Sequence, residues 1–262
     1  MTKPKTAIVT GGGRGIGAAI ARRLSADGYN LLITSTDGAT ARAVADELTA
    51  AGGTAKGVAA DAADPASGAA IVDAALAEFG NLHVLVNNAG ISSLQPFLEL
   101  SLAEWQRVMD VNLTAYFTAM QAAARHMVGG GYGRIINISS LVHGHAVALR
   151  TAYSVSKAAI NQLTRQAALE LGRYGVTVNA VAPGIIETDM VRNAHTPEMR
   201  RAFTRMIPVG RYGHVDEIAA TVAFLASEGA SYISGECIGV DGAVVAALTY
   251  AGPDPDQQSV SA

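Results

Sequence analysis

Seven short apolar runs, each separated from the next by enough residues for a helix, constrain the fold of this 262-residue chain more than any other feature. Parallel strands need a long crossover between them, usually a helix, whereas antiparallel strands can be joined by a tight turn. The alternation therefore predicts an α/β fold with a doubly wound parallel sheet of seven strands. The runs are TAIVT (6–10), LLITS (31–35), AKGVAA (55–60), VLVNNAG (84–90), RIINISS (134–140), VTVNAVAPG (176–184) and ECIGV (236–240).

Capping signals mark three helix starts. Asp64 and Pro65 are typical of an N-cap and a first-turn proline, and Ser101 with Glu104 forms a capping box before a helix expected at about 102–128. Pro197, followed by Glu198, marks a later start. Further helices are expected to begin near Ile16, Thr40 and Thr151.

Composition narrows the possible partners. Half of the residues are apolar, so the chain can bury one core, and we expect one domain over 1–250 followed by the polar tail AGPDPDQQSVSA (251–262). The net charge of -3 favours a small-molecule partner over nucleic acid or a membrane surface. Cys237 is the only cysteine, and the first residues do not have the pattern of a signal peptide. A cytoplasmic protein is the expectation.

The first apolar run leads into the glycine-rich turn TGGGRGIG. Gly11, Gly15 and Gly17 would let a phosphate approach the backbone amides at the start of the next helix, where the helix dipole favours anions. The spacing is G-x-x-x-G-x-G rather than G-x-G-x-x-G. Phosphate binding and a tight strand-to-helix connection are both compatible with this turn.

The fourth run ends in NNAG. Asn88, Ala89 and Gly90 would lie at the carboxyl edge of the sheet, where open α/β folds bind their ligands. The alternative is an asparagine turn that satisfies only its own backbone.

Tyr153 and Lys157 are four residues apart in TAYSVSK, so a helix would place both on one face. At about 4 Å and an effective dielectric of about 20, a positive charge is worth about 4 kcal/mol and favours loss of the phenol proton. A surface pair is the ordinary alternative. Ser140, thirteen residues upstream at the end of a strand, favours a catalytic role for the pair.

Together these motifs resemble the short-chain dehydrogenase/reductase family over residues 5 to about 245. The ordered set is TGGGRGIG, Asp61 after the third strand, NNAG, Asn112 in DVNL, Ser140, YSVSK, and PGIIET at 183–188. Within the family the sequence is most similar to bacterial 3-oxoacyl carrier-protein reductases. The resemblance implies a Rossmann-type fold.

The resemblance also implies a reaction, namely hydride transfer between a nicotinamide cofactor and a carbonyl or secondary alcohol. Tyr153 would be the acid/base, and Lys157 would bind the nicotinamide ribose and assist the phenol. Ser140 would polarise the carbonyl, and Asn112 would hold a water that relays protons. The non-enzyme alternative is a cofactor-binding regulatory protein that has lost this chemistry.

We expect NADP(H) as the cofactor. The second strand ends at Ser35 and Thr36 rather than at a carboxylate, and Arg14 can reach a 2′-phosphate. Asp37 keeps NAD open as the alternative. The expected cofactor contacts are Gly11, Arg14, Gly15, Ile16, Gly17, Ser35, Thr36, Asp61, Asn88, Ala89, Gly90, Tyr153, Lys157, Pro183, Gly184, Ile186 and Thr188.

Residues 185–211 resemble the family's substrate lid, whose sequence does not identify the substrate. Candidate substrate contacts are Ser140, Gln95, Leu141, His145, Tyr153, Ile185 and Met190. HMVGGGYGRI is rich in glycine where carrier-protein reductases often have basic residues, so a ketone, keto-ester, sugar or polyol is an equal alternative. His143 and His145 lack an evident third ligand, and no metal is expected.

The helices expected at 102–128 and 152–174 are apolar on more than one face. In the family these helices pair across a two-fold axis, which implies a homotetramer or a dimer. Deep burial of the helices within one subunit is the alternative.

Overall fold

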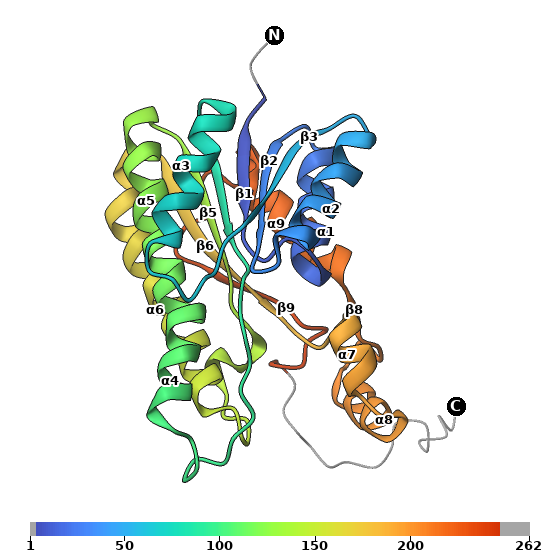
Figure 1. The fold of residues 1–262 in the computed structure, drawn as a ribbon. Coiled ribbons are helices and arrows are strands. Elements are labelled where there is room, and N and C mark those ends of the chain that lie inside the picture. The colour runs from blue at the N-terminus through green and yellow to red at the C-terminus, as the bar shows by residue number, and fades with distance from the viewer. Residues whose placement is uncertain (1–3, 247–262) are drawn as a thin grey trace, which may run out of the picture.

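A seven-stranded parallel sheet is the centre of the computed structural model, which describes residues 4–246 apart from the side chain of Met190 (Figure 1). The strand order is β3-β2-β1-β4-β5-β6-β9, so the winding reverses between β1 and β4. This confirms the predicted doubly wound fold. The strands are β1 (Thr6–Val9), β2 (Asn30–Ser35), β3 (Thr54–Ala59), β4 (Val84–Asn87), β5 (Gly133–Ile138), β6 (Val176–Pro183) and β9 (Cys237–Val240).

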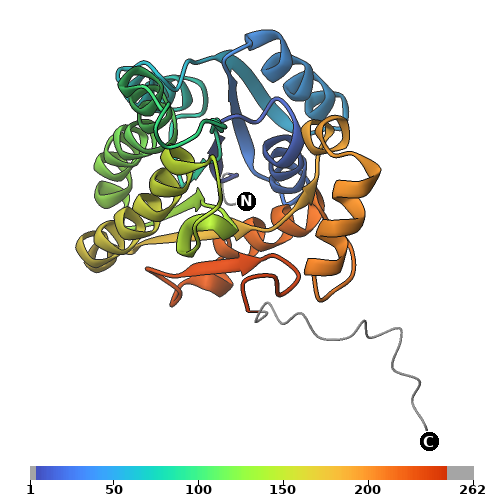
Figure 2. The same cartoon turned by 90° about the horizontal axis from the view of Figure 1, so that it is seen from below.

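Helices cover both faces of the sheet (Figures 1 and 2). One face packs against α1 (Gly15–Ala26), α2 (Gly38–Ala50) and α9 (Val215–Ala226). The other face packs against α3 (Ser67–Phe79), α5 (Ala115–Gly130) and α6 (Thr151–Leu171). Successive strand residues point to opposite faces, so Ile33 joins the first core and Leu32 the second. The central strands are continuously apolar because both of their faces are buried.

Two of the capping predictions need correction. Helix α3 begins at Ser67 rather than at Pro65, and Asp64 and Pro65 lie in the turn before it, where the Asp64 carboxylate accepts a hydrogen bond from the amide of Ala66. Ser101 caps α4 (Leu102–Met109) as predicted, but the Glu104 carboxylate accepts from Arg107 rather than completing the capping box. The prediction for Pro197 is confirmed, with Thr196 as the N-cap of α8 (Pro197–Met206).

The helix expected at 102–128 is interrupted. A π-helical turn, η1 (Asp110–Thr114), separates α4 from α5 and contains Asn112. The segment DVNLT has no glycine or proline that would signal a break. Single π turns inside α-helices are frequent at functional sites.

The chain after β6 forms the segment that we predicted as a lid. Residues 185–211 contain β7 (Ile186–Glu187), α7 (Asp189–Ala194) and α8, and β8 (Gly213–His214) follows directly after this segment. Strand β7 pairs with β8 in a small parallel sheet that the sequence pattern did not indicate. Both guanidinium Nη atoms of Arg200 donate to the Glu187 carboxylate and tie α8 to β7.

The remaining elements are short 3-10 turns, namely η2 (Leu141–Gly144), η3 (Gly172–Tyr174) and η4 (Glu228–Ala230). No helix between residues 4 and 246 is long and apolar enough to cross a bilayer. The predicted tail at 251–262 lies outside the described residues.

Candidate active site

The glycine turn between β1 and α1 lies against the end of β4. Gly11 has a φ of +64°, and a Cβ atom there would lie 2.9 Å from the Cα of Ala89. A Cβ on Gly17 would collide with the carbonyl oxygen of Gly11. The Asn88 amide donates to the carbonyl oxygens of Thr10 and Gly11 at 3.0 and 3.1 Å. These close approaches require glycine and hold the two strand ends together.

Gly15 faces open space instead. Its φ is +53°, and the only atom within 4 Å of a Cβ built there is Cγ2 of Thr188, at 3.7 Å. The N-cap of α1 is Arg14, whose side chain makes no capping hydrogen bond. The amides at the start of α1 are thus left for another partner, as a bound pyrophosphate would require. The residues present fit a dinucleotide between this turn and Thr188.

The other predicted cofactor residues also lie along the carboxyl edge of the sheet. Asp61 follows β3, and its exposed carboxylate accepts from the amide of Ala63. Pro183 ends β6 and Ile186 begins β7. A Cβ on Gly184 would lie 2.6 Å from the Cα of Asp241, so the chain passes close to the segment after β9.

The end of β2 leads into α2, whose start carries one acid, Asp37, and one cation, Arg42. Ser35 is the last residue of the strand, and its hydroxyl accepts from the Thr40 hydroxyl at 3.0 Å. Asp37 caps α2, and its carboxylate accepts from the amide of Ala39 at 2.9 Å. Arg14 is exposed in the turn before α1, where a Cβ on its neighbour Gly13 would lie 2.5 Å from the Thr40 hydroxyl oxygen. Sequence reasoning missed Arg42, whose Nη1 would lie 2.9 Å from a Cβ on Gly38.

Lys157 is buried within the protein. Its ammonium donates to the carbonyl oxygen of Ile138 at 2.8 Å and lies 5.7 Å from the centroid of the Tyr153 ring. A Cβ on Gly90 would lie 3.6 Å from it. Burial lowers the pKa of Lys157 from 10.5 to about 7. The structure therefore brings Lys157 beside Tyr153 and beside the NNAG loop at the same time.

Asn112 connects three parts of the site. Its side-chain oxygen accepts from the amide of Ile91 at 2.8 Å, and its amide donates to the Ile91 carbonyl at 2.9 Å. The same amide donates to the Ser156 hydroxyl at 3.1 Å, which in turn donates to the carbonyl of Tyr153 at 2.7 Å. The π-helical turn, the loop after β4 and the start of α6 are thus linked through one buried side chain.

Ser140 lies at the end of β5, next to α6. It is buried, and its hydroxyl accepts from the amide of Val142 at 3.4 Å. The neighbouring Ser139 hydroxyl donates to the carbonyl of Lys157 at 3.2 Å and joins the two elements. Ser139 and Ser156 were not singled out in the sequence, although both lie within the motifs that were.

The predicted substrate residues are less closely grouped. The main-chain N–H of Gln95 donates to the carbonyl of Leu149. The side-chain oxygen of Gln95 is buried and has no hydrogen-bond partner among residues 4–246. Leu141 is partly buried in η2, and His145 is exposed. Ile185 lines a cavity of about 100 Å³ beneath the segment 185–211. The side chain of Met190 lies outside the described residues.

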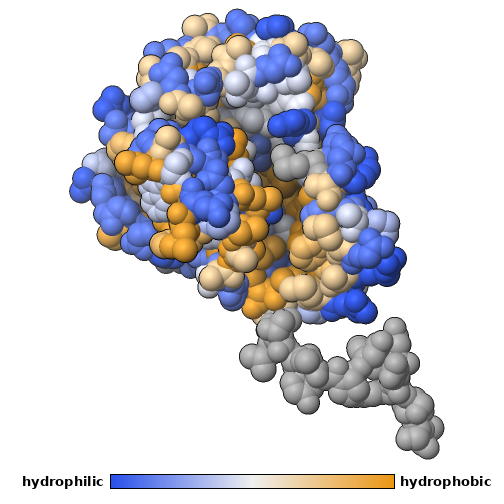
Figure 3. Space-filling model, turned by 60° about the horizontal axis from the view of Figure 1, so that its bottom comes forward, coloured by the Kyte–Doolittle hydropathy of each residue, from blue (hydrophilic) through white to orange (hydrophobic). Residues whose placement is uncertain are grey.

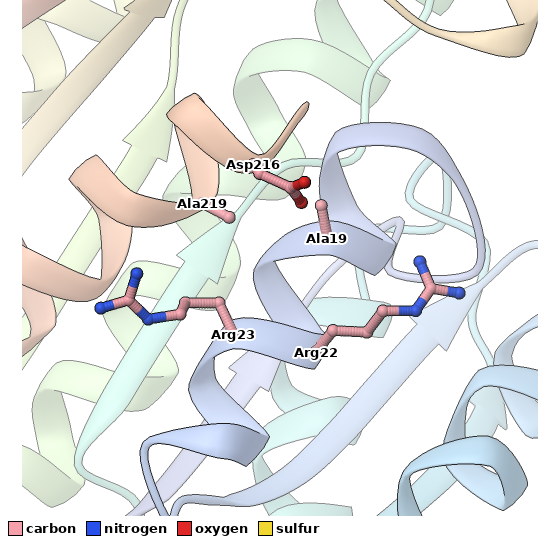
Figure 4. A pocket seen from close by; sticks show the side chains of 5 residues that line it. All are labelled: Ala19, Arg22, Arg23, Asp216 and Ala219. Carbon is pink, nitrogen blue, oxygen red and sulfur yellow. The ribbon is translucent and has the colours of Figure 1, made fainter. Parts of the chain in front are cut away.

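A larger surface pocket, of about 260 Å³, is shown in Figure 4. It is lined by Ala19, Arg22 and Arg23 of α1 and by Asp216 and Ala219 of α9. Tyr153 and Lys157 belong to α6, on the opposite face of the sheet. Within residues 4–246, no three His, Cys, Asp or Glu side chains group as metal ligands would. The candidate active site is the carboxyl edge of the sheet.

Known proteins share this architecture. Residues 11–244 match the family model described as enoyl-(acyl carrier protein) reductase. A 3-oxoacyl-[acyl-carrier-protein] reductase FabG from Aquifex aeolicus is 42% identical over 243 residues, which cover 91% of this chain and 96% of that protein.

Two solved structures contain nicotinamide cofactors. An NAD(P)-dependent dehydrogenase from Beutenbergia cavernae, with NADP bound at low occupancy, has 37% identity and a TM-score of 0.89, and the match covers 94% of this chain and 98% of that one. A 7α-hydroxysteroid dehydrogenase, complexed with NADH and a 7-oxo bile acid, has 33% identity and a TM-score of 0.89. The match covers 92% of this chain and 94% of that one. This chain belongs to the short-chain dehydrogenase/reductase family, whose members interconvert carbonyl and alcohol groups with NAD(P).

Proposed function

We propose that Ser140, Tyr153, Lys157 and Asn112 catalyse this oxidoreduction and that NADP(H) is the preferred cofactor. The observation that carries the proposal is the burial of Lys157 between the Ile138 carbonyl, the NNAG loop and the Tyr153 ring. Burying an amine costs desolvation free energy. A buried amine beside a phenol therefore indicates a functional role for the pair.

The cofactor supplies the hydride or accepts it, and the chain manages the proton. In reduction, the Tyr153 phenol donates its proton to the carbonyl oxygen, while the Ser140 hydroxyl donates a hydrogen bond to the same oxygen. In oxidation, the Tyr153 phenolate removes the proton of the alcohol. Lys157 holds a positive charge beside the ring when it is protonated, and Asn112 fixes the start of α6 through Ser156.

The preference for NADP(H) rests on the charges at the end of β2. Arg14 is exposed, Ser35 is uncharged, and Asp37 is engaged in capping α2. We expect kcat/KM for NADPH to exceed that for NADH in the wild type. Ser35→Asp should shift the ratio toward NADH by about 10- to 150-fold, because a carboxylate there would repel a 2′-phosphate and accept from a 2′-hydroxyl.

Steady-state kinetics with both cofactors measures this ratio. Ser231→Asp adds the same charge at an exposed position after η4 and serves as the control. A wild-type ratio below one would show that the end of β2 does not select the phosphate. An unchanged ratio in Ser35→Asp would show that Ser35 does not face the adenosine ribose.

The segment 185–211 is proposed as a lid over the reacting groups, within one cofactor-binding and catalytic domain that extends to about residue 250. Support for the lid comes from its place after β6 and from Thr188 opposite Gly15. Lids of this kind exclude water during the reaction.

A panel of ketones and alcohols with both cofactors, followed by absorbance of the reduced nicotinamide, tests the activity. Cofactor binding without any turnover would favour the regulatory alternative. A cytoplasmic location remains our expectation.

We also propose that the protein is a homo-oligomer, with a tetramer as the favoured form. Phe117 on α5 and Leu169 on α6 are 46% and 78% exposed, so these helices carry apolar side chains that their own subunit does not cover. We expect light scattering at micromolar concentration to give a dimer or tetramer. Leu169→Glu should produce smaller species, whereas Ala43→Glu on the exposed side of α2 should not. A monomeric wild type would rule out the assembly.

A further inference from the structure

Arg150 lies beside the proposed acid/base and has no role in the function proposed above. It directly precedes α6, three residues before Tyr153. Its Nη1 donates to the Ser92 hydroxyl at 2.7 Å, and its Cζ lies 5.7 Å from the centroid of the Tyr153 ring. Arg150 is half-buried as a residue, and its guanidinium bridges the loop after β4 and the start of α6, next to the reacting group.

No carboxylate between residues 4 and 246 forms an ion pair with Arg150. Two acids on the surrounding elements already have partners, since Glu104 is paired with Arg107 and Glu187 with Arg200. A guanidinium has five N–H donors, and the Ser92 hydroxyl uses one of them. A guanidinium without a carboxylate partner, at the edge of an active site, is suited to an anionic ligand.

The backbone before Arg150 is held in an unfavourable conformation. Leu149 has a φ of +65°, which is uncommon for a large side chain, and its carbonyl accepts from the main-chain amide of Gln95 at 2.9 Å. The carbonyl of Arg150 then accepts from Ser154 in the first turn of α6. Strain of this kind persists at functional sites, where the surrounding contacts impose it. Here it fixes the position of Arg150 relative to Tyr153.

The charge of Arg150 also reaches the proposed lid. His195 follows α7, and its pKa is lowered mainly by burial and further by the positive charges of Arg200 and Arg150. The face of the molecule that carries this edge is hollowed and bordered by apolar side chains (Figure 3). Exposed apolar residues on the elements around the site include Leu94, Leu149, Met206 and Val209. Among these groups, Arg150 supplies the charge available to a substrate.

We propose that Arg150 determines specificity by binding the carboxylate of the substrate, so that the enzyme acts on oxo acids and the corresponding hydroxy acids. The inference rests on the proposed function, because Tyr153 marks where the carbonyl reacts. One guanidinium and one hydroxyl suit a monoanion such as a carboxylate. A phosphate ester carries more charge and would leave oxygens without donors at this place.

The test measures binding separately from turnover. Isothermal titration of the protein saturated with the oxidised cofactor is carried out with the isomeric oxohexanoates and their methyl esters, since an oxo acid cannot be reduced by that complex. The wild type should bind at least one acid about 10- to 100-fold more tightly than its ester. Arg150→Gln should lose this difference, and Arg150→Lys should keep part of it. Arg173→Gln, at the far end of α6, is the matched control.

Two further variants and ligands separate the possible failures. Tyr153→Phe should still prefer the acid, because the guanidinium of Arg150 and not the phenol binds the carboxylate. A wild type that binds an oxo acid but turns over no ketone or alcohol would reject the proposed catalysis and leave this site standing. Equal binding of acid and ester by the wild type, or no binding of any acid, would overturn the assignment. If Arg150→Gln loses affinity equally for the acid and for its ester, Arg150 only supports the structure. Tighter binding of hydroxyacetone phosphate than of every oxo acid would replace the carboxylate with a phosphate ester.

Discussion

Tyr153→Phe should reduce turnover by about 10²- to 10⁴-fold, with the affinity for the cofactor nearly unchanged. The substitution keeps the ring and removes only the hydroxyl that exchanges a proton with the substrate oxygen. Tyr153 is in the first turn of α6, and its carbonyl, rather than its hydroxyl, takes part in the hydrogen bonds that hold Asn112 and Ser156. The loss should therefore appear in kcat and leave the fold intact.

Tyr29→Phe is the matched control, because it also removes one tyrosine hydroxyl. That hydroxyl donates to the carbonyl of Ala226 at the end of α9, away from the site. Both variants are compared with the wild type by steady-state kinetics and by cofactor titration. Retention of more than about a tenth of wild-type turnover in Tyr153→Phe would assign the proton transfer to another group.

The fold follows from local patterns that the structure confirms. Apolar runs predicted all seven strands because both faces of a parallel sheet are buried. Glycines in the first turn also have a local reason, since Gly11 and Gly17 meet backbone where a side chain would not fit. Sequence order then placed Gly15, Asn88, Ser140 and Thr188 at one edge, because the carboxyl ends of parallel strands lie together.

Tertiary contacts determine what the sequence did not reveal. The π-helical turn at Asn112 has no breaker residue to signal it, and it is stabilised by hydrogen bonds to Ile91, twenty-one residues away. Arg150 has no motif, because its partner Ser92 is fifty-eight residues away. The start of α3 was predicted two residues too early, because an acid followed by proline also occurs in the turn that precedes a helix. Contacts between residues far apart in the sequence depend on how the elements pack, and the spacing of residues within one motif does not predict that packing.

Lys157→Met should abolish most of the activity while making the protein more stable at neutral pH. Methionine is close in length to lysine and fits a buried site without a charge. Turnover should fall by at least about 10²-fold, and the KM for the cofactor should rise, because the proposed roles of Lys157 concern both the phenol and the ribose. A purely structural lysine would show the opposite combination, with stability lost and chemistry retained.

The stability gain has a pH dependence that follows from the lowered pKa. Burial shifts the pKa of Lys157 from 10.5 in the unfolded chain to about 7 in the folded protein, so the unfolded chain binds the proton more tightly. Wild-type stability is therefore lost as pH falls from about 10 toward 7, and the full shift corresponds to about 5 kcal/mol. Loss of the hydrogen bond to Ile138 offsets about 1 to 3 kcal/mol of the gain.

Thermal unfolding of both proteins at pH 6 and pH 9 measures this difference. The Tm of Lys157→Met should exceed that of the wild type at pH 6, and the excess should shrink or reverse at pH 9, where the wild-type amine is neutral in the folded state. A Tm difference that does not change with pH would mean that Lys157 keeps an ordinary pKa in the fold. The Lys157 ammonium would then be solvated or paired with an acid. In that case the buried hydrogen bond to the Ile138 carbonyl could not be what holds Lys157 beside Tyr153.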